Sequence, residues 1–77
     1  MKISERQAAS IKTLCVTAQQ NNQVLNHPIA TLELLRTMDP GLDIVENIYP
    51  WIRQHENEKL TMQDIVTQLL LTIDEQE

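Results

Sequence analysis

The amino-acid sequence predicts an all-α fold, a small compact bundle of four amphipathic helices. Apolar residues recur every three or four positions in four segments, which is the spacing of a helix with one buried face. Capping residues precede these segments, and Pro28, Pro40 and Gly41 stand at the junctions between them. We therefore predict helices over residues 4–22, 28–38, 40–56 and 62–75, in one helical domain that spans residues 1–77.

The segment 60–73 has the clearest start signal. The Thr61 hydroxyl can accept from the Asp64 amide while the Asp64 carboxylate accepts from the Thr61 amide, which is a capping box. Leu60 and Ile65 flank this box and can pack together as a hydrophobic staple. At 100° per residue, the predicted core face of this helix consists of Met62, Ile65, Val66, Leu69, Leu70 and Ile73.

Leu71 lies on the opposite side of that helix from the predicted core face. It is either a tolerated apolar residue on the surface or a contact with a second chain. Beyond it, Asp74, Glu75 and Glu77 gather at the negative end of the helix dipole, where carboxylates are mildly unfavourable. We expect this acidic C-terminal tail to fray.

The first helix opens with a second capping box, formed by Ser4 and Gln7. Cys15 lies within its apolar stripe, and neither His nor Arg is near it in the sequence to activate the thiol. We interpret Cys15 as a packed side chain. The predicted apolar face consists of Ala8, Ile11, Leu14, Cys15 and Ala18.

Pro28 fits the first position of the second helix. On its outer side Glu33 and Arg36 are spaced to pair. The residues predicted to face inward are Leu32, Leu34, Leu35 and Met38.

The third helix contains Pro50, which would normally interrupt it. Pro50 falls on the polar side, however, where a bend convex toward solvent tolerates it. We therefore predict one helix kinked at Pro50, capped either by Asp39 or, after a turn, by Asp43. Its apolar residues keep one broad face on both sides of the proline: Leu42, Ile44, Val45, Ile48, Tyr49, Trp51 and Ile52.

The composition argues against catalysis, and we predict no enzyme, no cofactor and no metal site. One cysteine and two histidines cannot supply a zinc-binding pattern, and a single glycine cannot build a phosphate-binding loop. His55 and Glu56 begin like a metalloprotease helix, but no second histidine follows at the required spacing. No signal peptide or membrane-spanning stretch is recognisable, so we expect a cytoplasmic protein without membrane contact.

The charge disfavours nucleic acid as a partner. Residues 1–31 hold three basic residues and one acidic residue, whereas the remainder holds three basic and ten acidic. Binding to a phosphate backbone requires clustered Lys and Arg. A small transcriptional regulator of helix-turn-helix type, with 61–70 as its first helix, remains the alternative function.

The favoured function is a non-catalytic protein–protein interaction module, a small regulator, inhibitor or adaptor that docks by a helix face. A 77-residue chain without a disulfide or metal has a thin core, so excess aliphatic residues favour burial against another protein or in a homodimer. The candidate interface residues are Leu71 and the only two aromatic residues, Tyr49 and Trp51. Either aromatic ring can instead close the rim of the chain's own core.

Overall fold

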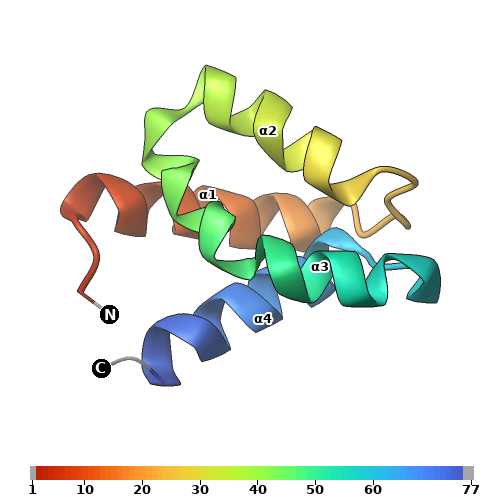
Figure 1. Ribbon diagram of the computed structural model, residues 1–77. Helices are drawn as coiled ribbons and strands as arrows, with labels where there is room; N and C mark the ends of the chain where they lie inside the picture. Colours follow the sequence, from red (N-terminus) through yellow and green to blue (C-terminus); the bar gives the residue numbers. More distant parts are fainter. Residues whose placement is uncertain (1, 76–77) are drawn as a thin grey trace.

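A computed structural model of the chain describes residues 2–75. Within this range the chain is all-α, as predicted, with four α-helices and two 3₁₀ segments (Figure 1). The elements in chain order are α1 (Glu5–Gln20), α2 (Pro28–Met38), η1 (Pro40–Ile48), α3 (Tyr49–His55), η2 (Glu56–Glu58) and α4 (Met62–Glu75).

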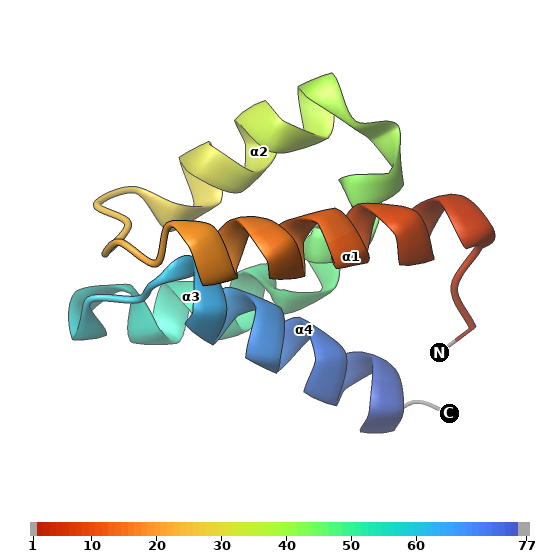
Figure 2. The ribbon, with the colours of Figure 1, turned by 180° about the vertical axis from the view of Figure 1, so that it is seen from behind.

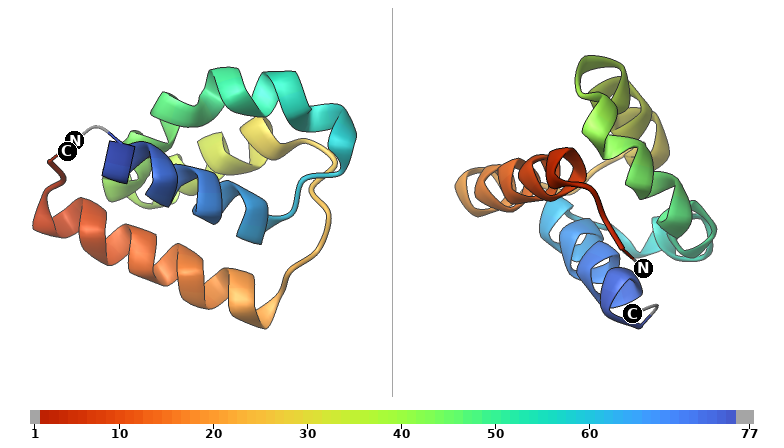
Figure 3. Two further views of the ribbon diagram at one scale, coloured as in Figure 1. Left: turned by 90° about the horizontal axis from the view of Figure 1, so that it is seen from below. Right: turned by 90° about the vertical axis from the view of Figure 1, so that its left-hand side faces the viewer.

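Segment η1 is the centre of the bundle, because it packs against α1, α2, α3 and α4. Helices α1 and α4 lie side by side on one side of it, and α2 lies toward the other side (Figures 1 and 2). The view from below in Figure 3 shows α4 between α1 and α3. The largest fully buried side chains come from four of these elements and are Leu32, Val45, Ile48, Ile52, Ile65, Val66 and Leu69.

Both predicted capping boxes are present. The Gln7 amide donates to Ser4 Oγ at 3.1 Å, and the Ser4 amide donates to Gln7 Oε1 at 2.9 Å. At the start of α4, the Asp64 amide donates to Thr61 Oγ1 at 3.3 Å and the Thr61 amide donates to Asp64 Oδ2 at 2.9 Å. Each box satisfies backbone donors that the first turn leaves without helical partners.

The connection between α1 and α2 is tied to the start of α4. Val24 and Thr61 form an isolated antiparallel bridge, beside which the Leu25 amide donates to the Leu60 carbonyl at 2.8 Å. Asn22 Oδ1 accepts a hydrogen bond of 3.2 Å from the amide of Gln63, a further free donor of the first turn of α4. The loop therefore helps to cap a helix that lies some forty residues further along the chain.

The helical segment predicted over 40–56 is present and changes direction between η1 and α3 (Figure 1). Its first nine residues form a 3₁₀ helix instead of an α-helix. Side chains three residues apart eclipse in a 3₁₀ helix, and Leu42, Val45 and Ile48 are accordingly all buried. Pro50 lies in the first turn of α3, where its missing amide hydrogen removes no helical bond.

Asp39 is the cap of η1, which decides between the two capping residues considered above. Asp39 Oδ1 accepts from the Gly41 amide at 3.0 Å, and Asp39 Oδ2 accepts from the Ser10 hydroxyl at 2.8 Å. Asp43 instead accepts from Gln7 Nε2 at 2.9 Å. These contacts join the α2–η1 corner to α1.

Several side chains predicted to be inside are on the surface. Leu34 is 64% exposed, Met38 is 75% exposed and Leu70 is 46% exposed, so their assignment to the core is wrong. Ala8 is also exposed. The helices dock through a narrower arc than the apolar pattern suggests, because η1 contacts α2 along the side that carries Leu32.

The predicted pair of Glu33 and Arg36 does not form. Arg36 pairs with Glu46 of η1 instead, because α2 and η1 pack together and bring these two side chains into contact. At the other end of the chain, Asp74 and Glu75 belong to α4, and Glu77 of the predicted frayed tail lies outside the described residues.

Candidate interaction surface

The outer side of α4, which carries the predicted site residue Leu71, combines exposed apolar side chains with carboxylates. We call it the α4 surface and define it by Trp51, Asp64, Thr67, Gln68, Leu70, Leu71 and Asp74. Trp51 belongs to α3, and the other residues lie on α4 outside the buried face that contains Ile65, Val66 and Leu69. The capping box at Thr61 sets where this helix begins, and the packing of its buried side chains sets which residues face outward.

Trp51 of α3 borders one end of the α4 surface. Its half-buried ring helps to line a hollow of about 310 Å³ with Glu58, Leu60 and three α4 residues, Asp64, Thr67 and Gln68. The Trp51 and His55 rings lie 4.9 Å apart between centroids, and His55 in turn pairs with Glu58. These contacts hold the indole at the junction of α3, η2 and α4.

Leu71 continues this surface by one helical turn. It follows Thr67 and Gln68 by four and three residues, which makes the three side chains neighbours on the helix. Leu71 is 50% exposed, and with Leu70 it borders a second hollow of about 390 Å³ whose other lining residues are Ile73 and Asp74. Leu71 therefore lies where the sequence places it, opposite the core face.

The charged residues of α4 are all acidic. Helix α4 contains Asp64, Asp74 and Glu75 but neither Lys nor Arg. Glu58 adds a carboxylate to the first hollow, next to Lys59 in the chain. An apolar strip with carboxylates at both ends is suited to a partner that combines apolar and basic groups.

Tyr49 does not join Trp51 on this surface. Two helical positions separate the rings by about 200°, so Tyr49 lies on the α2 side of α3. Its hydroxyl is buried and has no hydrogen-bond partner among residues 2–75. The nearby phenol oxygen, followed by the Glu46 carboxylate, raises the pKa of Arg36, which keeps this guanidinium charged.

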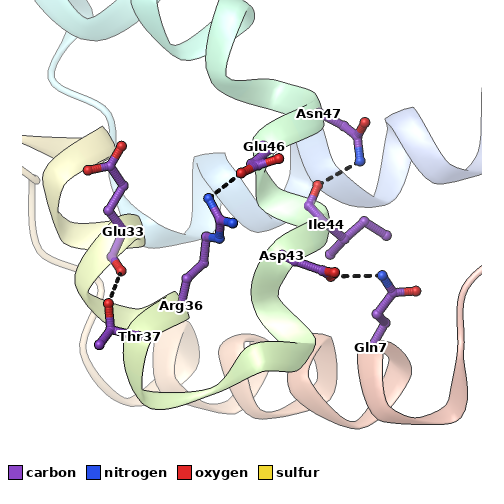
Figure 4. A network of polar contacts seen from close by, with 8 residues as sticks. All are labelled: Gln7, Glu33, Arg36, Thr37, Asp43, Ile44, Glu46 and Asn47. Carbon is purple, nitrogen blue, oxygen red and sulfur yellow. Dashed lines mark hydrogen bonds and ion pairs between the residues drawn. The ribbon is translucent and has the colours of Figure 1, made fainter.

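A third hollow, of about 540 Å³, lies between α2 and η1 and is lined by Glu33, Arg36, Thr37, Pro40 and Asp43. Figure 4 shows that two of its charged side chains have partners outside the lining: Arg36 pairs with Glu46, and Asp43 accepts from Gln7 Nε2 at 2.9 Å. Thr37 donates to the Glu33 carbonyl at 3.0 Å. The Arg36–Glu46 pair therefore holds η1 against α2, and the Gln7–Asp43 hydrogen bond holds it against α1.

A separate stripe of uncharged and mostly apolar residues, which we call the α2 stripe, runs along α2 and consists of Thr31, Leu34, Leu35 and Met38. These residues have the spacing i, i+3, i+4 and i+7 of a helix face, and none of them is charged. The sequence pattern predicted that Leu34, Leu35 and Met38 face inward; Leu35 is partly buried and packs against the core, whereas Leu34 and Met38 are exposed. The sequence does indicate that Leu32 and Leu34 cannot both be buried on one narrow face, because they lie about 200° apart around the helix.

Neither a metal-binding cluster nor a membrane-spanning helix is present among residues 2–75. No three His, Cys, Asp or Glu side chains in this range come together in a way that could hold a metal ion. No helix in the same range is long and apolar enough to cross a membrane.

Comparison of the chain with known protein families, characterised proteins and solved structures finds no match in any of the three. What the α4 surface can bind is therefore inferred from its own shape and charge.

Proposed function

We propose that this chain is a non-catalytic protein–protein interaction module, a small cytoplasmic regulator, inhibitor or adaptor that docks through the α4 surface. The observation that carries the proposal is the exposure of Leu70 and Leu71, which line a hollow further along α4 from the Trp51 hollow. A partner that covers these two leucines removes their exposed apolar area from water, and this area stays hydrated in the monomer.

The free energy available from burying the α4 surface is suited to a modest, reversible contact. Full burial of an exposed leucine side chain contributes about 1.5–3 kcal/mol. Because Leu70 and Leu71 are already half buried, covering each of them contributes only part of that free energy. A partly exposed tryptophan is the residue type most often found among binding hot spots. Trp51, Leu70 and Leu71 together form the apolar centre of a small interface, and the polar side chains of Thr67 and Gln68 lie among them.

Photo-crosslinking in cells that naturally produce the chain tests the proposal. A benzophenone amino acid replaces Leu71 in one variant and Thr13, on the exposed side of α1, in a matched control. We expect a discrete crosslinked protein of defined mass from the Leu71 variant and none from the Thr13 variant. The same faint adducts from both positions would contradict docking at α4.

Self-association is the second form of this proposal. The sequence analysis makes Leu71 the leading candidate for a dimer contact. Two copies of the acidic α4 would repel each other, however. The α2 stripe supports a homodimer better, because Leu34 and Met38 are the most exposed large apolar residues described and their stripe is uncharged.

Light scattering after size exclusion distinguishes the two dimer contacts. A homodimer held by α2 becomes monomeric in the double variant Leu34→Ser/Met38→Ser and keeps its mass in Leu71→Ser. The reverse result would place the dimer contact on α4. A wild-type monomer at every concentration would remove self-association altogether.

A further inference from the structure

We propose that the α4 surface binds a basic amphipathic helix of a partner protein. This inference rests on the proposed function and adds the chemistry of the partner. Two features of the surface support it. Apolar side chains line two hollows along α4, Trp51 in the first and Leu70 and Leu71 in the second, and each hollow also contains a carboxylate, Asp64 in the first and Asp74 in the second.

The shape of the surface fits one helix lying along it. The hollow at Trp51 reaches the α4 residues Asp64, Thr67 and Gln68, and the hollow at Leu71 reaches Asp74. Ten residues of α4 span about 15 Å, which equals roughly three turns of a partner helix. Apolar side chains one or two turns apart on such a helix can each enter one hollow.

The charges select the partner's polar residues. The Asp64 carboxylate uses Oδ2 for the Thr61 cap, and Oδ1 makes no hydrogen bond with any of residues 2–75, so it can accept from an incoming ammonium or guanidinium. Asp74 and Glu75 are exposed and supply acceptors at the other end. Lys or Arg residues at both ends of the partner's apolar stripe complement these groups.

The same charges disfavour the competing occupants. In a symmetric contact of α4 with a second α4, an antiparallel arrangement brings Asp64 toward Asp74, and a parallel one brings each carboxylate toward its own copy. No basic residue of α4 offsets this repulsion in either orientation. Nucleic acid and anionic membranes are repelled in the same way.

Fluorescence of Trp51, the only tryptophan of the chain, tests the proposal directly. The probe is a synthetic helical peptide of about 14 residues, roughly 21 Å long, with leucines at i, i+3, i+4 and i+7 and lysines elsewhere. The controls are a peptide with glutamates in place of the lysines and a Leu/Lys peptide of scrambled order. We expect saturable binding of the first peptide only, and weaker binding as salt is raised.

Variants locate the binding. Leu71→Ser should weaken binding about tenfold, Asp74→Asn/Glu75→Gln should weaken it severalfold with a smaller salt dependence, and Leu34→Ser on α2 should leave it unchanged. Circular dichroism of each variant checks its folding, and the Asp74→Asn/Glu75→Gln variant alters no buried residue.

Three results would overturn the proposal. They are equal binding of the ordered and scrambled Leu/Lys peptides, an unchanged affinity in Leu71→Ser, or a homodimer that depends on Leu71. If the peptide fails but the Leu71 crosslink to another protein persists, the interaction module stands and only the basic partner is excluded. If the crosslink is also absent, the proposed function itself fails.

Discussion

The Ser10 hydroxyl donates a hydrogen bond of 2.8 Å to Asp39 Oδ2, and this contact fixes the α2–η1 corner against α1. Ser10 is 4% exposed and is the one buried polar side chain among residues 2–75. Asp39 can reach the Ser10 hydroxyl because Gly41, two residues later in the chain, has no Cβ to occupy the space beside it. A Cβ built there would lie 2.2 Å from Ser10 Oγ and 2.8 Å from the Arg6 carbonyl oxygen.

Replacing Gly41 with alanine should therefore destabilise the chain by about 1–3 kcal/mol, as overpacking does in other cores. The double variant Ser10→Ala/Gly41→Ala should lose less than the sum of the two single variants, because removing Oγ relieves the shorter contact. Urea denaturation of all four proteins measures the coupling. Strict additivity would mean that Gly41 is not packed against Ser10.

The Thr61 cap provides a second test. Thr61→Ala removes the acceptor for the Asp64 amide and should lower the free energy of unfolding by about 1 kcal/mol. Thr67→Ala, an exposed position within the same helix, is the matched control and should cause no loss, since alanine has the higher helix propensity. Equal losses in the two variants would show that the cap contributes nothing.

Substitutions at Leu71 and Ile73 distinguish the exposed side of α4 from its buried side. Leu71→Lys should preserve helicity and change stability by no more than about 0.5 kcal/mol, because its side chain is half exposed. Ile73→Lys places an ammonium at a buried position and should destabilise the chain by several times that amount. Circular dichroism with urea titration compares them. Unfolding of Leu71→Lys would mean that Leu71 belongs to the core.

Replacing Tyr49, unlike the substitutions above, is not expected to destabilise the chain. Because its buried hydroxyl lacks a partner, Tyr49→Phe should leave the free energy of unfolding unchanged or raise it by up to about 1 kcal/mol. Arg36→Met serves as the comparison, since it removes the partner of Glu46 and should cost little, because water screens an exposed ion pair. A clear loss in Tyr49→Phe would indicate a hydrogen bond to Arg36.

Local signals predicted much of this fold. Capping boxes at Ser4 and Thr61 and the proline at position 28 mark helix starts that depend on neighbouring residues only. The 3₁₀ geometry of η1 was missed because Leu42, Val45 and Ile48 also fit one face of an α-helix.

The orientation of α2 could not be read from its sequence. Leu32 and Leu34 both belong to apolar arcs, and only the docking of η1 decides that Leu32 is buried and Leu34 exposed. The same holds for the site. Leu71 was predictable from helical phase, but the separation of Tyr49 from Trp51 and the hollow beside Trp51 depend on how α3 meets α2 and α4.

Amide chemical-shift mapping by nuclear magnetic resonance tests the central claim, that α4 is the docking surface, most directly. Adding the Leu/Lys helical peptide to ¹⁵N-labelled protein should shift the amides of Thr67, Gln68, Leu71 and Asp74 and the indole N–H of Trp51. The amides of Ala30, Leu34 and Met38 on α2 should stay in place. Shifts centred on α2, or spread evenly over the chain, would contradict the account.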